Sequence, residues 1–338
     1  MVTVGIVGCG YWGPNLVRNF DALDDAKVKT ICDTNKSRLA HLKKIYPGAE
    51  TTTDYKKLFE DRDIDAVAIA TPVSSHFELA KESIASGKHT FIEKPMASSS
   101  NECESLIQLA KKNSVILMVG HTFIYTATVR KIKEIIDNND IGDILYISSR
   151  RLNLGLFQKD INVIWDLAPH DVSIILYLLG KMPVAVNCQG KSHVNNGVED
   201  VASLSLDFED GVFAMVHSSW LDPNKVREMV IVGTKRMIVY DDTQPLEKLK
   251  IYDKRLELPP HYDTFAEFHF SYHYGDVYSP YIKQDEPLKV ECQHFLDCIQ
   301  SGSQPISSGK EGLTVVKILE AASESLKENG NRVAFRDK

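Results

Sequence analysis

The sequence has no long apolar run. None of its 338 residues falls in an uninterrupted apolar segment of roughly 18–20 residues, the length that a membrane span needs. The first apolar run, Val2 to Val7, has no basic segment before it and passes directly into glycines, which is not the pattern of a signal peptide. We therefore expect a cytoplasmic protein with no membrane partner.

Cysteine and net positive charge are also scarce. The 6 cysteines lie far apart and include no C-x-x-C pair, which predicts reduced, mostly buried thiols and no zinc site. The 39 lysines and arginines are outnumbered by 46 aspartates and glutamates, which gives a formal net charge of −7. Because phosphate backbones are bound by a basic field, this balance argues against a nucleic-acid partner.

Short apolar runs alternate with helical segments over the first 120 residues. Strands are predicted at 2–7, 28–32, 64–70, 90–92 and 115–119, and helices from near Pro14 and at 37–44, 76–86 and 100–112. This alternation predicts an α/β domain with a doubly wound parallel sheet of the Rossmann type at residues 1–120.

The pattern changes after Gly120. Helices are predicted at 127–138 and 165–179, and strands at 144–152, 184–188, 201–206, 212–217, 226–232 and 237–240, before two closing helices near 288–300 and 313–328. Asp210-Gly211 lies between two of the strands and predicts a hairpin turn. Residues 121–338 are therefore expected to form an α+β domain with a mostly antiparallel, open sheet.

A glycine motif lies between the first strand and the first helix. Gly8-Cys9-Gly10-Tyr11-Trp12-Gly13 reads G-x-G-x-x-G, in which the glycines permit a tight turn, close approach of a pyrophosphate and close helix packing. The N-terminus of the following helix attracts the phosphates. Asp33 closes the second strand 20 residues past Gly13, where a carboxylate accepts from ribose hydroxyls. These features predict a dinucleotide-binding site.

Asp33 also bears on which dinucleotide is bound. A carboxylate at this position repels a 2′-phosphate, so NAD is expected rather than NADP. Arg38 follows five residues later and is suited either to a phosphate or to the adenine face, or is a solvated helix residue.

A second set of motifs resembles a known family. Glu93-Lys94-Pro95 directly follows the fourth predicted strand, and with Thr71-Pro72 and His76 it resembles the Gfo/Idh/MocA family of sugar oxidoreductases. Asp166-Leu-Ala-Pro-His170 resembles the family's D-x-x-x-H helix, and the stretches 291–297 and 309–322 resemble its carboxy-terminal part. The resemblance covers nearly the whole chain.

The resemblance implies roles for individual residues. Lys94 would act between nicotinamide and substrate, with Asp166 and His170 facing it across the cleft as the other catalytic groups. The implied cofactor contacts are Gly8, Gly10, Tyr11, Trp12, Gly13, Asp33, Arg38, Thr71, Pro72, His76, Glu93, Lys94 and His121. The expected substrate contacts are Lys94, Arg151, Asn153, Trp165, Asp166 and His170. The Lys94-Pro95 bond is commonly cis in similar proteins.

The residues themselves agree with part of this reading. Positions i and i+4 of a helix share a face, so Asp166 and His170 point the same way and suit an acid–base pair. Arg151, Asn153, Lys225 and Arg227 could meet a sugar-nucleotide diphosphate, or be surface residues. Which of Lys94 and His170 is the base stays open.

Three further stretches narrow the resemblance to a subfamily. Residues 11–20, 120–123 and 163–171 resemble enzymes that oxidise the 3-hydroxyl of UDP-N-acetylglucosamine or of its uronic acid. Related members reduce 3-keto sugars or act on inositols, so a reductase or an inositol or free-sugar dehydrogenase is the alternative. A dinucleotide-binding regulator without turnover is a third hypothesis, and the intact catalytic set argues against it.

Two other features carry weaker expectations. His269 and His273 have the spacing of metal ligands, but no accompanying cluster supports a metal. The aromatic stretch 262–281 suits a loop over the substrate or a subunit contact. The family's second-domain sheet leaves one face open, so a homodimer or homotetramer through that sheet is expected.

Overall fold

The computed structural model describes residues 1–155, 157–158, 161–257 and 271–335. The chain divides into two compact units, and each is described by itself. Unit 1 contains Met1–Thr126 and Asp285–Glu320, and unit 2 contains Ala127–Gln284 and Ala321–Lys338. The sequence analysis predicted a single domain boundary, after residue 120. The structure differs, because residues 285–320 also belong to the first unit.

Unit 1 is built on a six-stranded parallel sheet in the order β3-β2-β1-β4-β5-β6. Its strands are β1 (Val2–Val7), β2 (Ala26–Cys32), β3 (Glu50–Thr52), β4 (Ala66–Ile69), β5 (His89–Glu93) and β6 (Leu117–Gly120). The expected parallel, doubly wound sheet is confirmed. Every residue of β4 is buried, as expected of a central strand covered on both faces. The edge strand β3 was not predicted, because Glu-Thr-Thr carries no apolar signal.

Four of the five α-helices between β1 and β6 of unit 1 begin close to where the sequence predicts them, and the short α3 was not predicted. The five are α1 (Gly13–Asp21), α2 (Lys36–Ile45), α3 (Lys56–Glu60), α4 (His76–Ala85) and α5 (Ser100–Asn113), with short 3₁₀ turns η1 (Val73–Ser75) and η2 (Thr122–Tyr125). Pro14 stands in the first turn of α1, where a missing N–H costs nothing. The Asn35 side chain caps α2 by accepting from the N–H groups of Ser37 and Arg38.

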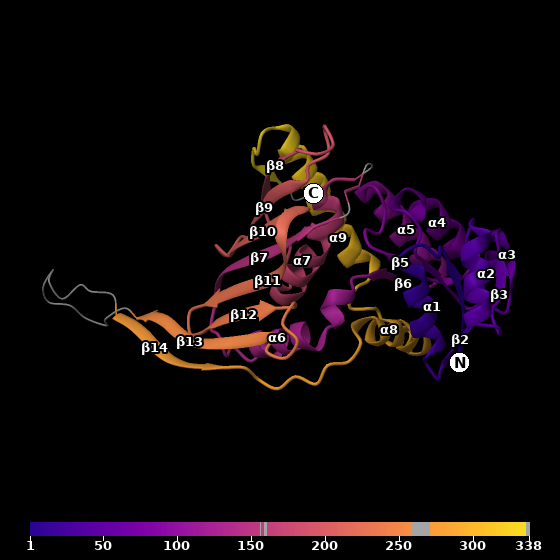
Figure 1. Ribbon diagram of the computed structural model, residues 1–338, viewed down its shortest axis with the longest axis horizontal. Helices are drawn as coiled ribbons and strands as arrows, with labels where there is room; N and C mark the ends of the chain where they lie inside the picture. The colour runs from indigo at the N-terminus through magenta and orange to yellow at the C-terminus, as the bar shows by residue number, and fades with distance from the viewer. Residues whose placement is uncertain (156, 159–160, 258–270, 336–338) are drawn as a thin grey trace, which may run out of the picture. The chain divides into compact units, whose positions relative to one another are not determined.

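The helix α8 (Pro287–Ser301) explains why residues from 285 onward belong to unit 1. It lies against α1 and η2, as Figure 1 shows for α1. The Phe295 ring makes edge contacts with Phe20 and Phe91, at centroid distances of 6.4 and 5.8 Å. Each such pair adds about 0.5–1.5 kcal/mol to the free energy gained by burying the rings. The division between the units then falls within α9 (Gly309–Lys327).

Unit 2 contains a nine-stranded sheet in the order β14-β13-β12-β11-β7-β10-β9-β8-β15. The strands are β7 (Ile144–Leu154), β8 (Ala185–Lys191), β9 (Val201–Asp207), β10 (Phe213–Ser219), β11 (Leu221–Gly233), β12 (Met237–Asp241), β13 (Leu249–Glu257), β14 (Ser271–Tyr278) and β15 (Val333–Ala334). Its pairs are antiparallel except for β7 with β10, which confirms a mostly antiparallel sheet. Gly211, with φ +83°, forms the predicted β9–β10 turn.

Strands β13 and β14 correct one expectation. The stretch 262–281 was expected to be a loop over the substrate or a subunit contact, and residues 271–278 are a strand paired with β13 rather than a loop. Tyr272 and Tyr274 are 67% and 73% exposed there, so the strand has no buried face from which a period of two can be read. The remainder of that stretch before residue 271 lies outside the described residues.

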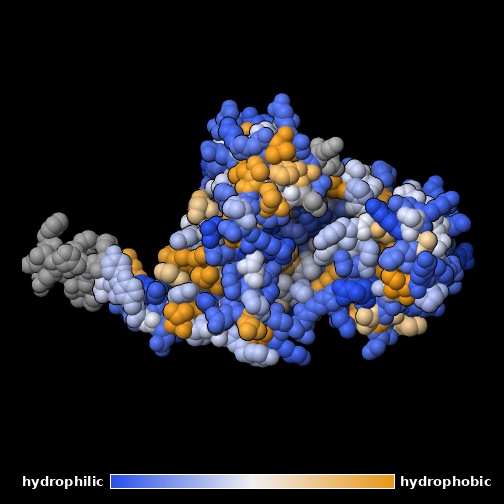
Figure 2. Space-filling view, in the orientation of Figure 1, coloured by the Kyte–Doolittle hydropathy of each residue, from blue (hydrophilic) through white to orange (hydrophobic). Residues whose placement is uncertain are grey.

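One face of the second sheet is covered by helix. The helix α7 (Val163–Leu179) contacts β7, β9 and β10 and packs with α6 (Ala127–Asp137), as Figure 1 shows. On the face that α7 does not cover, Tyr146 and Met215 are exposed. In the view of Figure 2, apolar surface of this unit occurs as separate patches among hydrophilic residues. Among the described helices, none is both long and apolar enough to cross a membrane.

Candidate functional site

The glycine loop follows β1 at the carboxyl end of the parallel sheet. Gly8 has φ +94°, and a Cβ there would lie 2.6 Å from the Ala70 carbonyl oxygen. A Cβ on Gly13 would lie 1.9 Å from the Gly8 carbonyl oxygen. These two glycines are therefore required by the fold itself. A Cβ on Gly10 would meet nothing within 4 Å, so this glycine leaves open space beside the backbone, as close approach of a pyrophosphate requires.

Asp33 stands where β2 ends and is buried beside this loop. The Cys9 N–H donates to its Oδ2 (2.6 Å) and the Asn35 N–H to its Oδ1 (2.7 Å). The Arg38 guanidinium, half exposed on α2, lies 3.7 Å from Asp33 Oδ2. The carboxylate thus tethers the glycine loop to β2, and each of its oxygens keeps a lone pair with which to accept from a ribose hydroxyl.

The predicted Lys94 loop follows β5, and the Lys94-Pro95 bond is cis, as the resemblance implied. His76, at the start of α4, joins this loop to the one after β4. Its ring nitrogens face two backbone carbonyl oxygens, Nδ1 that of Pro95 (2.9 Å) and Nε2 that of Thr71 (2.8 Å). Burial, rather than these two contacts, dominates and lowers the pKa of His76. A neutral imidazole has one N–H and so donates to one of these two carbonyls. The ring lies between the loop after β4, where Pro72 precedes η1, and the loop after β5.

Glu93 is the last residue of β5 and is paired in register with Gly120 of β6. A Cβ on Gly120 would lie 3.0 Å from Glu93 Oε2, so the glycine makes room for this carboxyl. The Lys94 N–H donates to the same oxygen (3.3 Å). Burial raises the pKa of Glu93 to about 7, although the neighbouring Lys94 charge opposes the shift. Near neutral pH this carboxyl can therefore gain or lose a proton.

His121 follows directly on β6 and is buried. Neither of its ring nitrogens has a hydrogen-bond partner among the described residues. Burial, followed by the charge of Lys94, lowers the pKa of His121 to about 3, so the ring is neutral at physiological pH. A buried polar atom that lacks a partner costs about 1–3 kcal/mol, so this neutral ring suits a polar ligand group. Together with the open space at Gly10, it fits the predicted dinucleotide.

Two other residues of the predicted cofactor set lie at the start of α1. Tyr11 is 91% exposed, and Trp12 is the residue immediately before the helix.

Glu291 on α8 is a buried carboxyl to which the sequence reading gave no role. The Thr122 hydroxyl donates to its Oε2 (2.7 Å). Burial, and then the charge of Glu93, raise the pKa of Glu291 well above its ordinary value. A signal was present, because Leu288, Glu291, Cys292 and Phe295 follow the helical i, i+3, i+4, i+7 pattern of a buried stripe. A carboxyl within such a stripe is unusual enough to predict a special environment.

In unit 2, helix α7 carries the predicted acid–base pair. Asn162 caps the helix by accepting from the Trp165 N–H (3.2 Å), which places Asp166 in the first turn and His170 one turn later. Pro169 lies between them and has no N–H to donate to the Trp165 carbonyl. The side chain of Trp165 is anchored separately. Its indole N–H donates to the Ser323 hydroxyl of α9 (2.8 Å), which fixes the ring that we expect to contact substrate.

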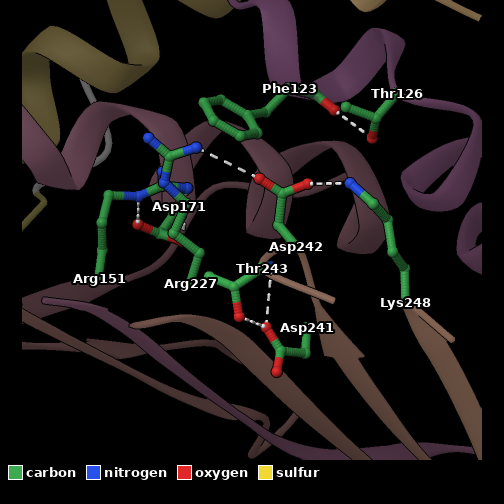
Figure 3. A network of polar contacts seen from close by, with 9 residues as sticks. All are labelled: Phe123, Thr126, Arg151, Asp171, Arg227, Asp241, Asp242, Thr243 and Lys248. Atoms are coloured by element: carbon green, nitrogen blue, oxygen red, sulfur yellow. Dashed lines mark hydrogen bonds and ion pairs between the residues drawn. The ribbon is translucent and has the colours of Figure 1, made fainter. Parts of the chain in front are cut away.

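Arg151 of β7 is held by the same helix. Its Nε and Nη2 donate to the two carboxylate oxygens of Asp171, at 2.6 and 3.2 Å, and both side chains are almost fully buried (Figure 3). The Ser149 hydroxyl donates to Asp171 Oδ1 (2.7 Å). Arg151 therefore is not the surface residue that the sequence also allowed, and its hydrogen bonds to Asp171 fasten β7 to α7. Asn153, two residues on, lies half-buried on the same side of β7.

A second polar group surrounds Asp242. Arg227 and Lys248 donate to its two oxygens, at 3.3 and 2.9 Å (Figure 3). Next to it, Asp241 accepts from the backbone and hydroxyl of Thr243. Arg227, a candidate diphosphate contact, thus shares the Asp242 carboxylate with Lys248.

Metal ligation finds no support in the described ranges. Within them, no three His, Cys, Asp or Glu side chains gather as they would around an ion. His273 instead pairs with Asp253 (3.0 Å), and its partner in the suspected motif, His269, lies outside the described residues.

The strand order of unit 1, its glycine loop and the acidic residue directly after β2 define an oxidoreductase with a NAD-binding Rossmann domain. The chain belongs to the Gfo/Idh/MocA family. Residues 2–121 match the model of an oxidoreductase family with a NAD-binding Rossmann fold, and residues 129–239 match the family's C-terminal domain.

The similar proteins include named dehydrogenases and an uncharacterised oxidoreductase. The chain is 28% identical to an uncharacterised oxidoreductase, YrbE, of Bacillus subtilis over 96% of this chain and 94% of that protein. It is 26% identical to a myo-inositol 2-dehydrogenase of Thermotoga maritima over 96% of both. A UDP-N-acetylglucosamine 3-dehydrogenase of Acidithiobacillus ferrooxidans has the same fold, with a TM-score of 0.79 at 24% identity, over 97% of this chain and 98% of that one.

Proposed function

We propose that the protein is an NAD-dependent dehydrogenase that oxidises the 3-hydroxyl of a nucleotide sugar of the UDP-N-acetylglucosamine type. The observation that carries this proposal is the position of Lys94. It directly follows β5, at the carboxyl edge of the sheet where the glycine loop also lies, and dinucleotides bind along this edge. A cationic residue there suits the substrate oxygen from which a proton and a hydride depart.

The bound nicotinamide would supply the hydride acceptor. Oxidation of an alcohol also requires a base within about 2.6–3.2 Å of the hydroxyl. In our proposal His170 accepts that proton, and Asp166, one turn earlier on α7, orients the imidazole and stabilises its charged form. Lys94 donates to the same oxygen, or exchanges roles with His170 as the base. The proposal requires both units to act on one substrate molecule.

The cofactor specificity is part of the proposal. Asp33 is buried as an anionic acceptor beside the glycine loop, which favours ribose hydroxyls and repels a 2′-phosphate. The ion pair with Arg38 reduces the positive charge available to such a phosphate. Both features support NAD over NADP.

The substrate proposal rests on the motifs at 11–20, 120–123 and 163–171, and on the shared fold of the UDP-N-acetylglucosamine 3-dehydrogenase. The inositol dehydrogenase relative supports the alternative that an inositol or free sugar is the substrate. A 3-keto sugar reductase uses the same groups in the reverse direction.

A substrate screen tests the proposal. UDP-sugars, inositols and free sugars would each be offered with NAD or NADP, and NADH or NADPH formation followed by absorbance. We expect turnover with NAD and a UDP-N-acetyl sugar. Turnover with inositol alone would establish the alternative, and equal affinity for NAD and NADP would overturn the cofactor assignment. Activity with none of them would count against the dehydrogenase itself.

We also propose a cytoplasmic homodimer or homotetramer that forms through the sheet face that α7 leaves uncovered. The exposed Tyr146 and Met215 on that face support a contact surface. All six cysteines are free and buried, which suits a reducing compartment. Light scattering at micromolar concentration tests the assembly, and a monomer would contradict it.

A further inference from the structure

Trp220 is the largest fully buried side chain among the described residues, and it lies between β10 and β11. Its indole N–H donates to Oδ2 of Asp166, at 3.1 Å. Buried indoles usually direct this N–H to a partner, because it is the only polar group of the ring. Here that partner is a carboxylate to which the proposed function assigns a catalytic role.

The backbone of Trp220 is fixed on both sides. Its N–H donates to the Asp200 carbonyl (2.9 Å), and its own carbonyl accepts from the Gly155 N–H (2.9 Å). Asp200 is itself buried, and its carboxylate accepts from the His193 and Val194 N–H groups (2.7 and 2.8 Å). The Trp220 backbone is therefore held from two sides, by the connection between β8 and β9 and by the end of β7.

The indole ring is held as firmly as its backbone. A Cβ on Gly155 would lie 2.7 Å from the Trp220 Cδ1, so only glycine lets the strand end approach the ring this closely. Phe157 packs edge-on against the indole, with ring centroids 5.8 Å apart. The N–H therefore has a fixed direction, and it points at Asp166.

We propose that Trp220 is a positioning residue that holds the Asp166 carboxylate in one orientation on α7. A carboxylate alone on the first turn of a helix can rotate about two side-chain bonds. The indole hydrogen bond to Oδ2 favours one rotamer of this side chain. The catalytic consequence rests on the proposed function, whereas the hydrogen bond itself does not.

Nuclear magnetic resonance tests the hydrogen bond without any substrate. The chain has 3 tryptophans and hence three indole N–H signals. Trp220→Phe assigns one of them, and we expect Asp166→Ala to move that same signal upfield as the carboxylate acceptor is lost. Trp12, in unit 1, supplies a reference signal that should stay in place. A Trp220 signal unchanged by Asp166→Ala would overturn the proposal.

Kinetics test the consequence. Trp220→Phe keeps an aromatic ring but removes the donor, so we expect kcat to fall about 10- to 100-fold while NAD affinity changes less than about twofold. Phe208→Leu is the control, since it removes a buried aromatic ring from the β9–β10 turn of the same unit and leaves the indole N–H intact. We expect it to lower the melting temperature but to change kcat less than about threefold.

A double-mutant cycle separates positioning from general damage. In an Asp166→Ala background, Trp220→Phe should change kcat by less than about twofold, because the residue through which it acts is gone. Full additivity of the two changes would overturn the proposal. If the unmutated protein oxidised no substrate in the screen, the proposed function would fail, and the resonance experiment would still decide whether Trp220 holds Asp166.

Discussion

The buried carboxyl groups of unit 1 and unit 2 differ in how they are paired. In unit 1, Glu93 and Glu291 are buried carboxyls whose pKa values burial raises, and the neutral His121 ring has no partner among the described residues. In unit 2, the buried Asp171 accepts from Arg151 and Ser149, and the buried Asp200 accepts from His193 (2.7 Å). These two carboxylates of unit 2 are paired within the protein, although the buried hydroxyls of Thr128 and Ser218 in the same unit have no hydrogen-bond partner among the described residues. The groups named at the edge of the first sheet are only partly paired.

The difference teaches what each unit contributes. Buried groups that the protein leaves partly satisfied gain free energy when a ligand supplies the missing partner, so ligand binding stabilises such a site. A fully paired network instead keeps its side chains in one arrangement before any ligand arrives. Unit 1 is suited to binding a cofactor, and unit 2 to presenting a preorganised acid–base pair.

The largest effect that tests this division is on turnover. Loss of a general acid or base lowers a rate roughly 10²- to 10⁴-fold, and we expect such a fall in kcat for His170→Ala and for Lys94→Ala. NAD affinity should survive the His170 change, because that residue lies in unit 2. His41→Ala, on the exposed side of α2, is the control and should keep full activity. Near-normal turnover in both variants would contradict the catalytic assignment.

A stability experiment tests the paired character of unit 2. Arg151→Ala leaves the Asp171 charge buried beside Ser149 alone, and breaking a buried ion pair in this way costs about 3–5 kcal/mol. The neighbouring Arg150 pairs with Glu228 at the surface (2.6 Å), and exposed pairs contribute about 0–1 kcal/mol. We therefore expect a clear fall in the urea midpoint of unfolding for Arg151→Ala and almost none for Arg150→Ala. Equal shifts would mean that burial of the pair does not matter.

The sequence predicted those parts of the molecule that follow a local rule. The glycine loop, the strand that ends at Asp33 and the i, i+4 spacing of Asp166 and His170 each need only neighbouring residues to be recognised. The apolar runs of the parallel strands are equally local, because such strands are covered on both faces. The resemblance then assigned roles to residues, such as Lys94, whose local sequence alone is uninformative.

The missing parts depend on contacts between distant segments. The return of α8 to unit 1 rests on packing of Phe295 against Phe20 and Phe91, which no local pattern reveals. The indole of Trp220 reaches Asp166 across 54 residues of sequence. The strand β14 has little buried surface, so its sequence does not show the alternation of apolar and polar residues by which a strand is recognised. Glu291 was the exception, because its place in an apolar stripe was visible in the sequence.

A pH experiment on the cofactor-free protein tests whether unit 1 holds partly satisfied groups. The Glu93 pKa, raised by burial from 4.5 to about 7, means that the folded protein keeps a proton that the unfolded chain has released. Stability should therefore fall as pH rises through this window, by about 3 kcal/mol once pH 8 is reached.

Glu93→Gln removes that loss, because an amide does not ionise. We expect its urea midpoint to exceed that of the unmutated protein at pH 8, and the two to converge near pH 4.5. Glu78→Gln, on the exposed side of α4, should leave the pH dependence unchanged. If the stability of the unmutated protein were flat from pH 5 to pH 8, the contrast between the units would lose its strongest support.

The smallest expected effect concerns Asp33, the residue of unit 1 whose carboxylate is already well bound by the protein. Its oxygens accept from Cys9 and Asn35, so Asp33→Ala loosens the glycine loop as well as removing the ribose acceptor. We expect the dissociation constant for NAD to rise about 10- to 100-fold, or roughly 1.5–3 kcal/mol, and the preference over NADP to shrink because the repelling charge is gone. Arg38→Ala keeps the carboxylate and both backbone hydrogen bonds, so its effect on NAD affinity should stay within about threefold. Titration of each variant with NAD and with NADP, followed by tryptophan fluorescence, measures both quantities. A larger loss for Arg38→Ala than for Asp33→Ala would show that the guanidinium, not the carboxylate, recognises the adenosine end of the cofactor.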